Sequence, residues 1–162
     1  MTSQPRTFAL IPASYVYLRR DDQVLLQQRI NTGYMDGHWV AGAAGHIEPG
    51  ETAQTAAVRE VAEELGVIVR ESDLRLLTVM QRTDGTDTPR EQRVDWFWAA
   101  TTWAGNPEIL EPTKNAQLAW CNLDQLPPLM PLYEQLVLAC WWGRTLPLTC
   151  SFGFDRDPAT LR

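Results

Sequence analysis

The stretch GHIEPGETAQTAAVREVAEELGV, residues 45–67, places a glycine-containing loop directly before the strongest helix pattern in the chain. Its segment 52–65 is rich in alanine and other good helix formers. Thr52 can cap the start of this helix, and Gly66 stands where a left-handed C-cap belongs. We therefore expect a helix from Thr52 to Leu65 that follows a tightly bent loop.

Three glutamates share one face of this predicted helix. A helix turns once per 3.6 residues, so Glu60, Glu63 and Glu64 are neighbours on its surface. Like charges at this spacing repel one another, and we expect Arg59 and a bound divalent cation to offset the repulsion. Carboxylate oxygens without thiolate or imidazole favour a hard ion such as Mg²⁺, with Mn²⁺ as the alternative.

The loop before the helix can approach a ligand closely. Gly45 and Gly50 allow its backbone to bend tightly, and it delivers Glu51 to the same end of the acidic helix. An acidic helix face by itself is usually solvated surface. The combination of loop, helix and carboxylates instead predicts a cradle for a metal ion and a diphosphate.

The spacing of these residues resembles a complete Nudix box, and the chain is similar to the MutT-like members of the Nudix hydrolase superfamily. Five residues separate Gly45 from Glu51, and seven more precede the run Arg59-Glu60-Val61-Ala62-Glu63-Glu64-Leu65-Gly66-Val67. The flanks show weaker similarity to the family in Leu25-Leu26-Gln27-Gln28-Arg29, Glu111-Pro112 and Trp120.

The resemblance implies a fold and a reaction. The fold is an α/β/α sandwich with a mixed sheet between helices, which we expect to form one domain over residues 1–162. The reaction is hydrolysis of a nucleoside diphosphate linked to another group. Water would attack one phosphorus in line while a metal ion neutralises charge on the phosphate oxygens.

The resemblance also implies roles for individual residues. Glu60 and Glu64 would be the principal metal ligands, with Glu63 supplementing them or binding a second ion. Arg59 would hold the glutamates in place through Glu51. A glutamate of the helix is the favoured general base, and the candidate from a later loop is Glu111.

One position departs from the family pattern. Many members have Pro-Gly-Gly where this chain has Ala43-Ala44-Gly45. In relatives the carbonyl before the last glycine often ligates metal, so Ala44 would have to supply it here. It can do so only if the backbone at Ala44 avoids positive φ.

Substrate contacts are harder to assign from the sequence. Arg29, Trp39, Trp120 and the backbone of Gly45 are the candidates nearest the expected pocket. Arg29 could instead form a surface ion pair, and most of the seven tryptophans are expected in the core. His38 and His46 could position a phosphate, although a lone histidine more often has a structural role.

The composition limits the partners. The net charge of −6 and the single lysine, Lys114, argue against binding of duplex nucleic acid, which needs a basic face. No apolar run approaches the length of a membrane span, and the first residues do not resemble a secretory signal. Three cysteines without a CxxC pair suggest free thiols and a cytoplasmic protein. The sequence leaves a homodimer open.

The substrate remains a choice among nucleotide-like molecules. A (d)NTP-like substrate is favoured because no secondary motif for ADP-ribose, NADH, coenzyme A or dinucleoside polyphosphates is evident. An ADP-ribose or nucleotide-sugar pyrophosphatase is the alternative. An isoprenoid diphosphate isomerase usually has a degraded box, and a non-catalytic nucleotide-binding sensor usually loses box glutamates, so the intact box argues against both.

The remaining pattern predicts strands that alternate with turns around a second helix. Loops are indicated at 31–37, 84–89 and 105–115, and Pro131 limits where the late helix can begin. Residues 143–162 have no clear period and receive no assignment. The predicted strands are 8–18, 23–29, 67–69, 74–81, 93–103 and 118–121, with a short apolar stretch at 39–44 and the second helix at 129–142.

Overall fold

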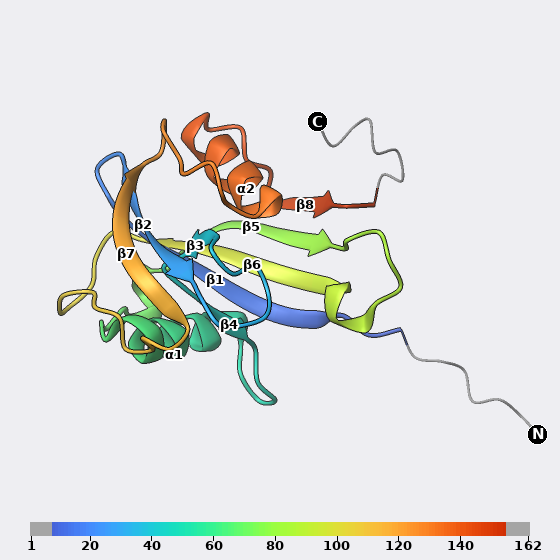
Figure 1. The fold of residues 1–162 in the computed structure, drawn as a ribbon, viewed down its shortest axis with the longest axis horizontal. Helices are drawn as coiled ribbons and strands as arrows, with labels where there is room; N and C mark the ends of the chain where they lie inside the picture. Colours follow the sequence, from blue (N-terminus) through green and yellow to red (C-terminus); the bar gives the residue numbers. More distant parts are fainter. Residues whose placement is uncertain (1–7, 155–162) are drawn as a thin grey trace, which may run out of the picture.

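Two helices cover opposite faces of a mixed β-sheet in the computed structural model, which describes residues 8–154 (Figure 1). This arrangement confirms the predicted α/β/α sandwich. The helices are α1 (Ala53–Leu65) and α2 (Leu132–Trp142). The strands are β1 (Ile11–Arg20), β2 (Gln23–Arg29), β3 (Trp39–Ala41), β4 (Ala43–His46), β5 (Arg75–Arg82), β6 (Arg93–Ala100), β7 (Asn115–Asn122) and β8 (Thr149–Phe152). Short 3-10 turns cover Glu71–Asp73 and Pro89–Glu91.

The sheet combines a meander with two parallel contacts. Its order is β3-β2-β1-β6-β5-β8, with β4 paired to β1 and β7 paired to β2. The contacts β1·β6 and β5·β8 are parallel, and the other pairs are antiparallel. The predicted hairpin of β1 and β2 pairs only near its turn, at Arg19↔Val24 and Arg20↔Gln23. Beyond that point β4 takes the place beside β1.

Alternation along β1 divides the core into two layers. Ala13, Tyr15 and Tyr17 belong to the cluster beneath α2, and Val16 and Leu18 belong to the cluster above α1. Successive residues of a strand point to opposite faces, so one strand contributes to both layers. The sheet is therefore buried on both faces, as the apolar character of β1 requires.

The predicted helix over 52–65 is confirmed, including both of its ends. The Thr52 side chain accepts a hydrogen bond from the Thr55 amide at 3.1 Å. Gly66 has φ 68° and donates its amide to the Ala62 carbonyl. Glycine adopts this left-handed conformation without the steric penalty that a side chain brings. These local signals set the ends of α1.

Several boundaries differ from the predictions. The predicted strand over 67–69 is wrong, because this segment forms only an isolated bridge between Ile68 and Ala104. The last strand, β8, lies in a segment that received no assignment, and it forms by pairing with β5. Predictions for residues 1–7 and 155–162 lie outside the described part of the chain. No helix within residues 8–154 is long and apolar enough to cross a membrane.

Candidate active site

Arg59 connects the loop before α1 with the acidic face of the helix. Its Nε and Nη2 donate to the two Glu51 carboxylate oxygens at 2.8 and 2.9 Å. Its Nη1 donates to Glu60 at 2.6 Å and to Glu63 at 3.2 Å, and Nη2 also reaches the His46 carbonyl at 3.0 Å. The bidentate contact lowers the pKa of Glu51 to about 2. The predicted bracing of the acids through Glu51 is therefore seen in the geometry.

Gly45 brings the sheet directly against the Glu60 carboxylate. A Cβ built on Gly45 would overlap the carboxylate atoms of Glu60, so no residue with a side chain fits this contact unchanged. The φ of Gly45 is negative, which means that space rather than backbone conformation requires glycine here. Burial raises the pKa of Glu60, although the neighbouring Arg59 opposes the shift.

Glu64 is held against the sheet one turn further along α1. Its Oε2 accepts hydrogen bonds from Gln27 Nε2 at 2.9 Å and from the Ala44 amide at 3.2 Å. Burial raises the pKa of Glu64 to about 7, and the negative charges of Glu60 and Glu111 add to the shift. The helix acids thus lie close enough to repel one another.

Glu111 reaches this group of acids from the loop before β7. The Leu110 amide, one residue before Glu111, donates to the Glu64 carbonyl at 3.1 Å, and the charge of Glu111 adds to the raised pKa of both Glu60 and Glu64. Lys114 donates to Glu111 at 2.8 Å. The loop over 105–115 therefore brings Glu111 towards the acidic face of α1, and a role for Glu111 in the site stays a prediction.

The donor set fits a hard divalent cation. Glu60, Glu64 and Glu111 offer oxygen ligands whose mutual repulsion a cation would relieve. The backbone at Ala44 has a negative φ, which satisfies the condition for its carbonyl to take part. Among residues 8–154, no group of three or more His, Cys, Asp or Glu side chains is already arranged to hold a metal ion. The helix acids instead contact Arg59, Gln27 and the Ala44 amide, which a metal ion would have to rearrange.

A cavity of about 410 Å³ opens beside these acids on the α2 side of the sheet. Ala44 and Gly45 form the part of its wall that borders the helix acids. Tyr15, Tyr34 and Tyr133 add aromatic surface, and the predicted substrate contact Arg29 also lies in the wall. The volume is within the range of pockets for small molecules, about 300–1,000 Å³.

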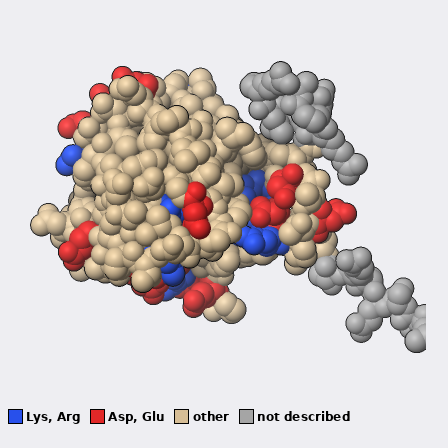
Figure 2. Space-filling view, viewed as in Figure 1, with Lys and Arg blue, Asp and Glu red and all other residues tan. Residues whose placement is uncertain are grey.

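The far wall of the cavity is an ion-pair network. Arg82 is 5% exposed, donates to Asp95 and to the Tyr15 hydroxyl, and its guanidinium lies 4.0 Å from the Tyr133 ring centroid. Arg93 contacts His46 Nε2 at 3.1 Å. Burial and the Arg93 charge lower the pKa of His46, which favours the neutral ring that accepts this hydrogen bond. Figure 2 shows acidic and basic side chains gathered on this part of the surface.

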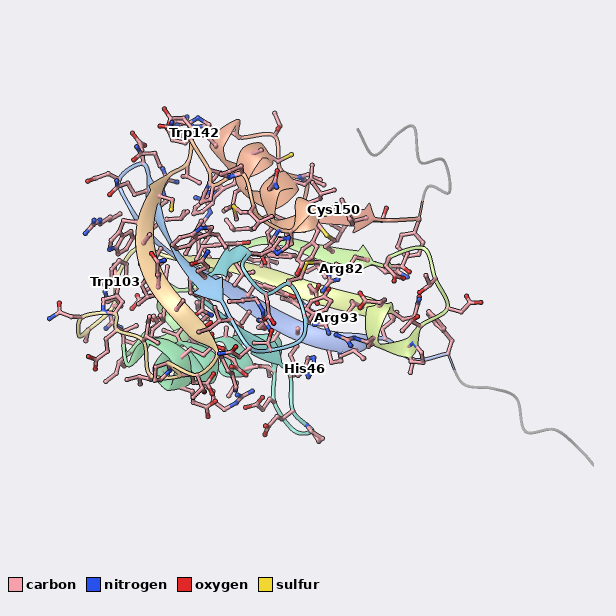
Figure 3. All side chains as sticks on the ribbon, viewed as in Figure 1. His46, Arg82, Arg93, Trp103, Trp142 and Cys150 are labelled. Atoms are coloured by element: carbon pink, nitrogen blue, oxygen red, sulfur yellow. The ribbon has the colours of Figure 1, made fainter. Side chains whose placement is uncertain are left out.

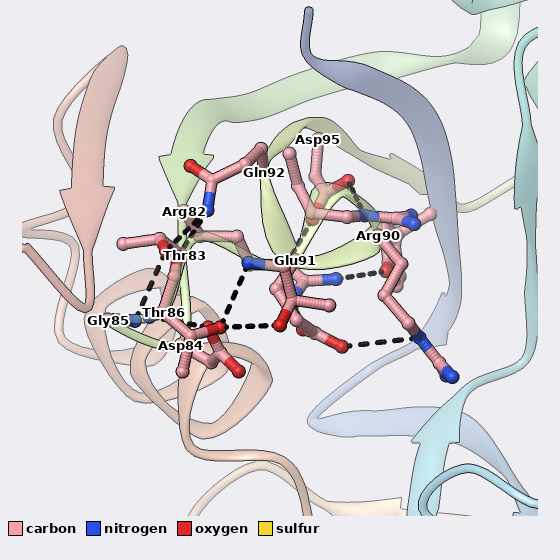
Figure 4. Close-up of polar contacts among 12 residues, drawn as sticks. Arg82, Thr83, Asp84, Gly85, Thr86, Arg90, Glu91, Gln92 and Asp95 are labelled. Atoms are coloured by element: carbon pink, nitrogen blue, oxygen red, sulfur yellow. Dashed lines mark hydrogen bonds and ion pairs between the residues drawn. The ribbon is translucent and has the colours of Figure 1, made fainter.

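The loop between β5 and β6 carries further charges to the rim of this wall. Gln92 Nε2 donates to the Thr83 hydroxyl at 3.2 Å and to the Thr86 carbonyl at 2.7 Å, which ties the loop together (Figure 4). Arg90 and Glu91 project from the end of this loop into the cavity wall. Arg90 lies over the Tyr34 ring at 4.9 Å, so the rim joins two separate loops.

Glu134 is a fully buried carboxylate in the wall of the same cavity. Its Oε2 accepts from the Tyr17 hydroxyl at 2.9 Å and from the Ala41 amide at 2.7 Å. Its Oε1 has no hydrogen-bond partner among residues 8–154. Burial raises the pKa of Glu134 to about 7. Glu134 is thus a lining residue of the cavity with a buried polar atom that lacks a partner, and such a group is a candidate for contact with a ligand.

Two predicted substrate contacts lie elsewhere. Trp39 packs against the hydrophobic cluster beneath α2, and it is not part of the cavity wall. Trp120 stacks on Trp103 at 6.0 Å and carries Arg20 over its ring at 4.0 Å, on the α1 side. Neither indole lines this cavity. Of the two histidines, only His46 reaches the cavity.

The sequence reasoning missed Arg82, Arg93, Asp95 and Glu134 on the α2 side. A signal for two of the residues was present in the sequence. Asp95 interrupts an otherwise apolar strand, and Glu134 interrupts an otherwise apolar helix. A charge inside such an element is seldom buried without a partner, and it can mark a polar site.

Known proteins are similar to this chain in sequence and in fold. The model of the NUDIX domain family matches residues 10–139. The NAD-capped RNA hydrolase NudC of Escherichia coli (strain K12 / DH10B) is 33% identical over 139 residues, which cover 81% of this chain and 49% of that protein. The chain thus spans about half the length of the curated relatives it matches.

Solved structures give the same result. The MutT NUDIX hydrolase from Burkholderia pseudomallei has a TM-score of 0.72 and 26% identity, covering 81% of this chain and 97% of that chain. The E. coli ORF135 protein has a TM-score of 0.65 and 24% identity, covering 83% and 89% of the two chains. The second likeness is one of fold.

Proposed function

The chain belongs to the NUDIX domain family, and on that premise we propose that it hydrolyses the diphosphate linkage of a small nucleotide-like substrate with the help of a divalent cation. One observation carries the proposal. Glu60, which Arg59 braces, lies against Gly45, and Gly45 also forms part of the wall of a cavity of about 410 Å³. A ligand in the cavity can therefore present its phosphates to the carboxylates.

Side chains of α1 would bind the cation and keep its ligands oriented. Glu60 and Glu64 would hold the cation, preferably Mg²⁺, with Mn²⁺ as a substitute and Glu63 as a further ligand. When bound, a divalent cation neutralises phosphate charge and acidifies water. Arg59 would keep Glu60 oriented, because its guanidinium is fixed by two hydrogen bonds to Glu51.

Two carboxylates are candidates for the general base. A glutamate of α1 remains the favoured one, since the helix acids stand nearest to the Gly45 wall. Glu111 is the alternative, and the Lys114 ammonium donates a hydrogen bond to its carboxylate at 2.8 Å. Either residue would take a proton from the attacking water, which must lie within hydrogen-bond reach.

The cavity supports a (d)NTP-like substrate. Arg29 lies in the wall and can contact a phosphate, while tyrosine rings offer surface for a base. Glu134 lies in the same wall, and its carboxyl group adds a polar group on the side where the base would bind. These groups together can orient a nucleoside whose phosphates point to Gly45.

A dinucleotide-like substrate is the second candidate. It is favoured by the similarity to a protein named as an NAD-capped RNA hydrolase, at 33% identity. In that case the diphosphate would join two nucleosides, and one of them would remain outside the cavity. An ADP-ribose or nucleotide-sugar substrate would bind in the same way.

The test is a panel of nucleoside triphosphates, sugar nucleotides, ADP-ribose and NAD with Mg²⁺, with products identified by mass. Glu60→Gln should abolish turnover of whichever substrate is cleaved and leave the far-UV circular dichroism spectrum unchanged. The matched control is Glu48→Gln, because Glu48 is an exposed acid in the loop before α1. Full activity in Glu60→Gln would refute the assignment of Glu60 as a metal ligand. If no substrate of the panel is cleaved, the result would favour a non-catalytic nucleotide-binding sensor.

A further inference from the structure

A second cavity, of about 650 Å³, lies at the other end of the sheet from the acids. The ends of β1, β5 and α2 enclose it, together with the loop after α2. Its wall contains three arginines, two tryptophans and one carboxylate: Arg19, Arg75, Arg144, Trp141, Trp142 and Asp22. None of these residues belongs to the first cavity.

The two cavities are far enough apart to be filled independently. Tyr15 is the last β1 residue that lines the first cavity, and Arg19 of the same strand lines the second. Four residues of extended strand span about 13 Å. Likewise α2 contributes Glu134 near its start to one cavity and Trp142 at its end to the other (Figure 3).

The second cavity is cationic in an acidic protein. The chain has a net charge of −6, yet three guanidinium groups face a single carboxylate here. Arg19 is accounted for, because it donates to the Asp21 carbonyl at 2.7 Å and lies 3.9 Å from Asp22. Arg75 and Arg144 are exposed, and their guanidinium groups have no hydrogen-bond or ion-pair partner in the described chain.

The end of α2 explains only part of this charge. The negative end of a helix dipole attracts cations, and Arg144 follows the last turn of α2. Arg75 begins β5 and lies at the end of no α-helix. The one carboxylate of the wall, Asp22, lies beside Arg19, so Arg75 and Arg144 remain available for the bidentate contacts that guanidinium groups make with phosphate. An anion would therefore bridge groups that the fold brings together from distant segments.

Indole surface lies next to these arginines. Trp141 is buried beneath the Arg19 guanidinium, 4.9 Å from its ring centroid. Trp142 is 41% exposed at the end of the same helix. Exposed indoles provide flat surface on which a nucleobase stacks, and such stacking tolerates any base. The arginines and the exposed indole together favour binding of an anion that carries an aromatic ring.

We propose that the second cavity binds a nucleoside phosphate, with the phosphate on Arg75 and Arg144 and the base stacked on Trp142. The ligand chemistry is the same for a free mononucleotide and for a nucleotide within a single RNA strand. The site uses neither the acids of α1 nor a metal ion, so it stands independently of the hydrolytic function.

Isothermal titration in EDTA tests the site without turnover. AMP, adenosine and inorganic phosphate are titrated into the wild type and into Arg75→Gln/Arg144→Gln. AMP should bind the wild type more tightly than either of the other two, and the double variant should lose at least about tenfold in affinity. Trp142→Leu should weaken AMP binding but leave phosphate binding unchanged.

Arg90→Gln reports on binding in the first cavity, whose wall contains Arg90, and Arg70→Gln is the matched control, since Arg70 is an exposed arginine outside both cavities. A loss of AMP affinity in Arg90→Gln but not in the double variant would overturn the proposal. So would equal affinities for AMP and phosphate, or no AMP binding at millimolar concentration. Titration with AMP and with a short oligoadenylate then distinguishes a free mononucleotide from a nucleotide within RNA, because a site for single-stranded RNA binds the oligomer more tightly.

Discussion

Glu134→Gln should remove a pH dependence from the stability of the fold. Burial raises the pKa of Glu134 from 4.5 to about 7. The folded protein therefore holds a proton over a pH range in which the unfolded chain has released it. Stability from this group is fully present below pH 4.5 and is lost as the pH rises through about 7. Glutamine cannot titrate, so the variant should lack this loss.

The size of the effect follows from the two pKa values. A difference of this size corresponds to about 3 kcal/mol in the free energy of unfolding. The side chain is fully buried, so solvent does not screen the effect. Glutamine keeps an oxygen that can accept from the Tyr17 hydroxyl and the Ala41 amide, which preserves the contacts of Oε2. The comparison thus isolates titration from packing.

Urea unfolding at pH steps from about 4 to about 8 measures the difference between wild type and variant. The wild type should lose about 3 kcal/mol relative to Glu134→Gln across this range. Subtraction removes the contributions of other titrating groups, among them Glu64. Glu48→Gln, at an exposed site, should run parallel to the wild type. Parallel curves for Glu134→Gln as well would show that Glu134 ionises normally, and the reasoning from burial would fail.

Three further outcomes follow from the geometry of the acids. Gly45→Ala should displace the Glu60 carboxylate and reduce turnover about 10- to 100-fold, measured as kcat/KM, whereas unchanged kinetics would mean that Glu60 has room to move. Arg59→Lys should lower the free energy of unfolding in urea by about 2 kcal/mol, because lysine cannot reproduce the bidentate contact with Glu51. An unchanged free energy of unfolding would mean that this contact does not stabilise the fold. Mg²⁺ should raise the Tm of the wild type and EDTA should reverse the rise, while Glu60→Gln should show neither effect; equal shifts in both proteins would place the ion elsewhere.

The acid site could be predicted from the sequence because its information is local. Thr52, Gly66 and the spacing of the glutamates lie within one short stretch, and helix geometry alone places Glu60 beside Glu64. Arg59 contacts Glu51 across eight positions of the same stretch. No long-range pairing has to be known for these contacts, and the structure reproduces them.

The cavity could not be predicted in the same way. Arg82, Arg93 and Glu134 come together because β1 pairs in parallel with β6 and α2 packs across them. Those contacts depend on strand order, which the period of each strand does not reveal. The same applies to β8, since its short segment becomes a strand only by pairing with β5. Tertiary contacts decide both features.

Strand β4 joins the locally encoded acids to the cavity that only the fold assembles. Neighbouring residues of a strand face opposite sides, so Gly45 meets Glu60 below the sheet while Ala44 lines the cavity above it. The pairing of Ser14 with Gly45 fixes this register, and the Ser14 hydroxyl also donates to the Ala53 carbonyl at the start of α1, at 2.6 Å. A shift of one residue would turn a methyl group towards the acids and take glycine to the other face. The same register that closes the sheet therefore also sets where a diphosphate can meet the carboxylates.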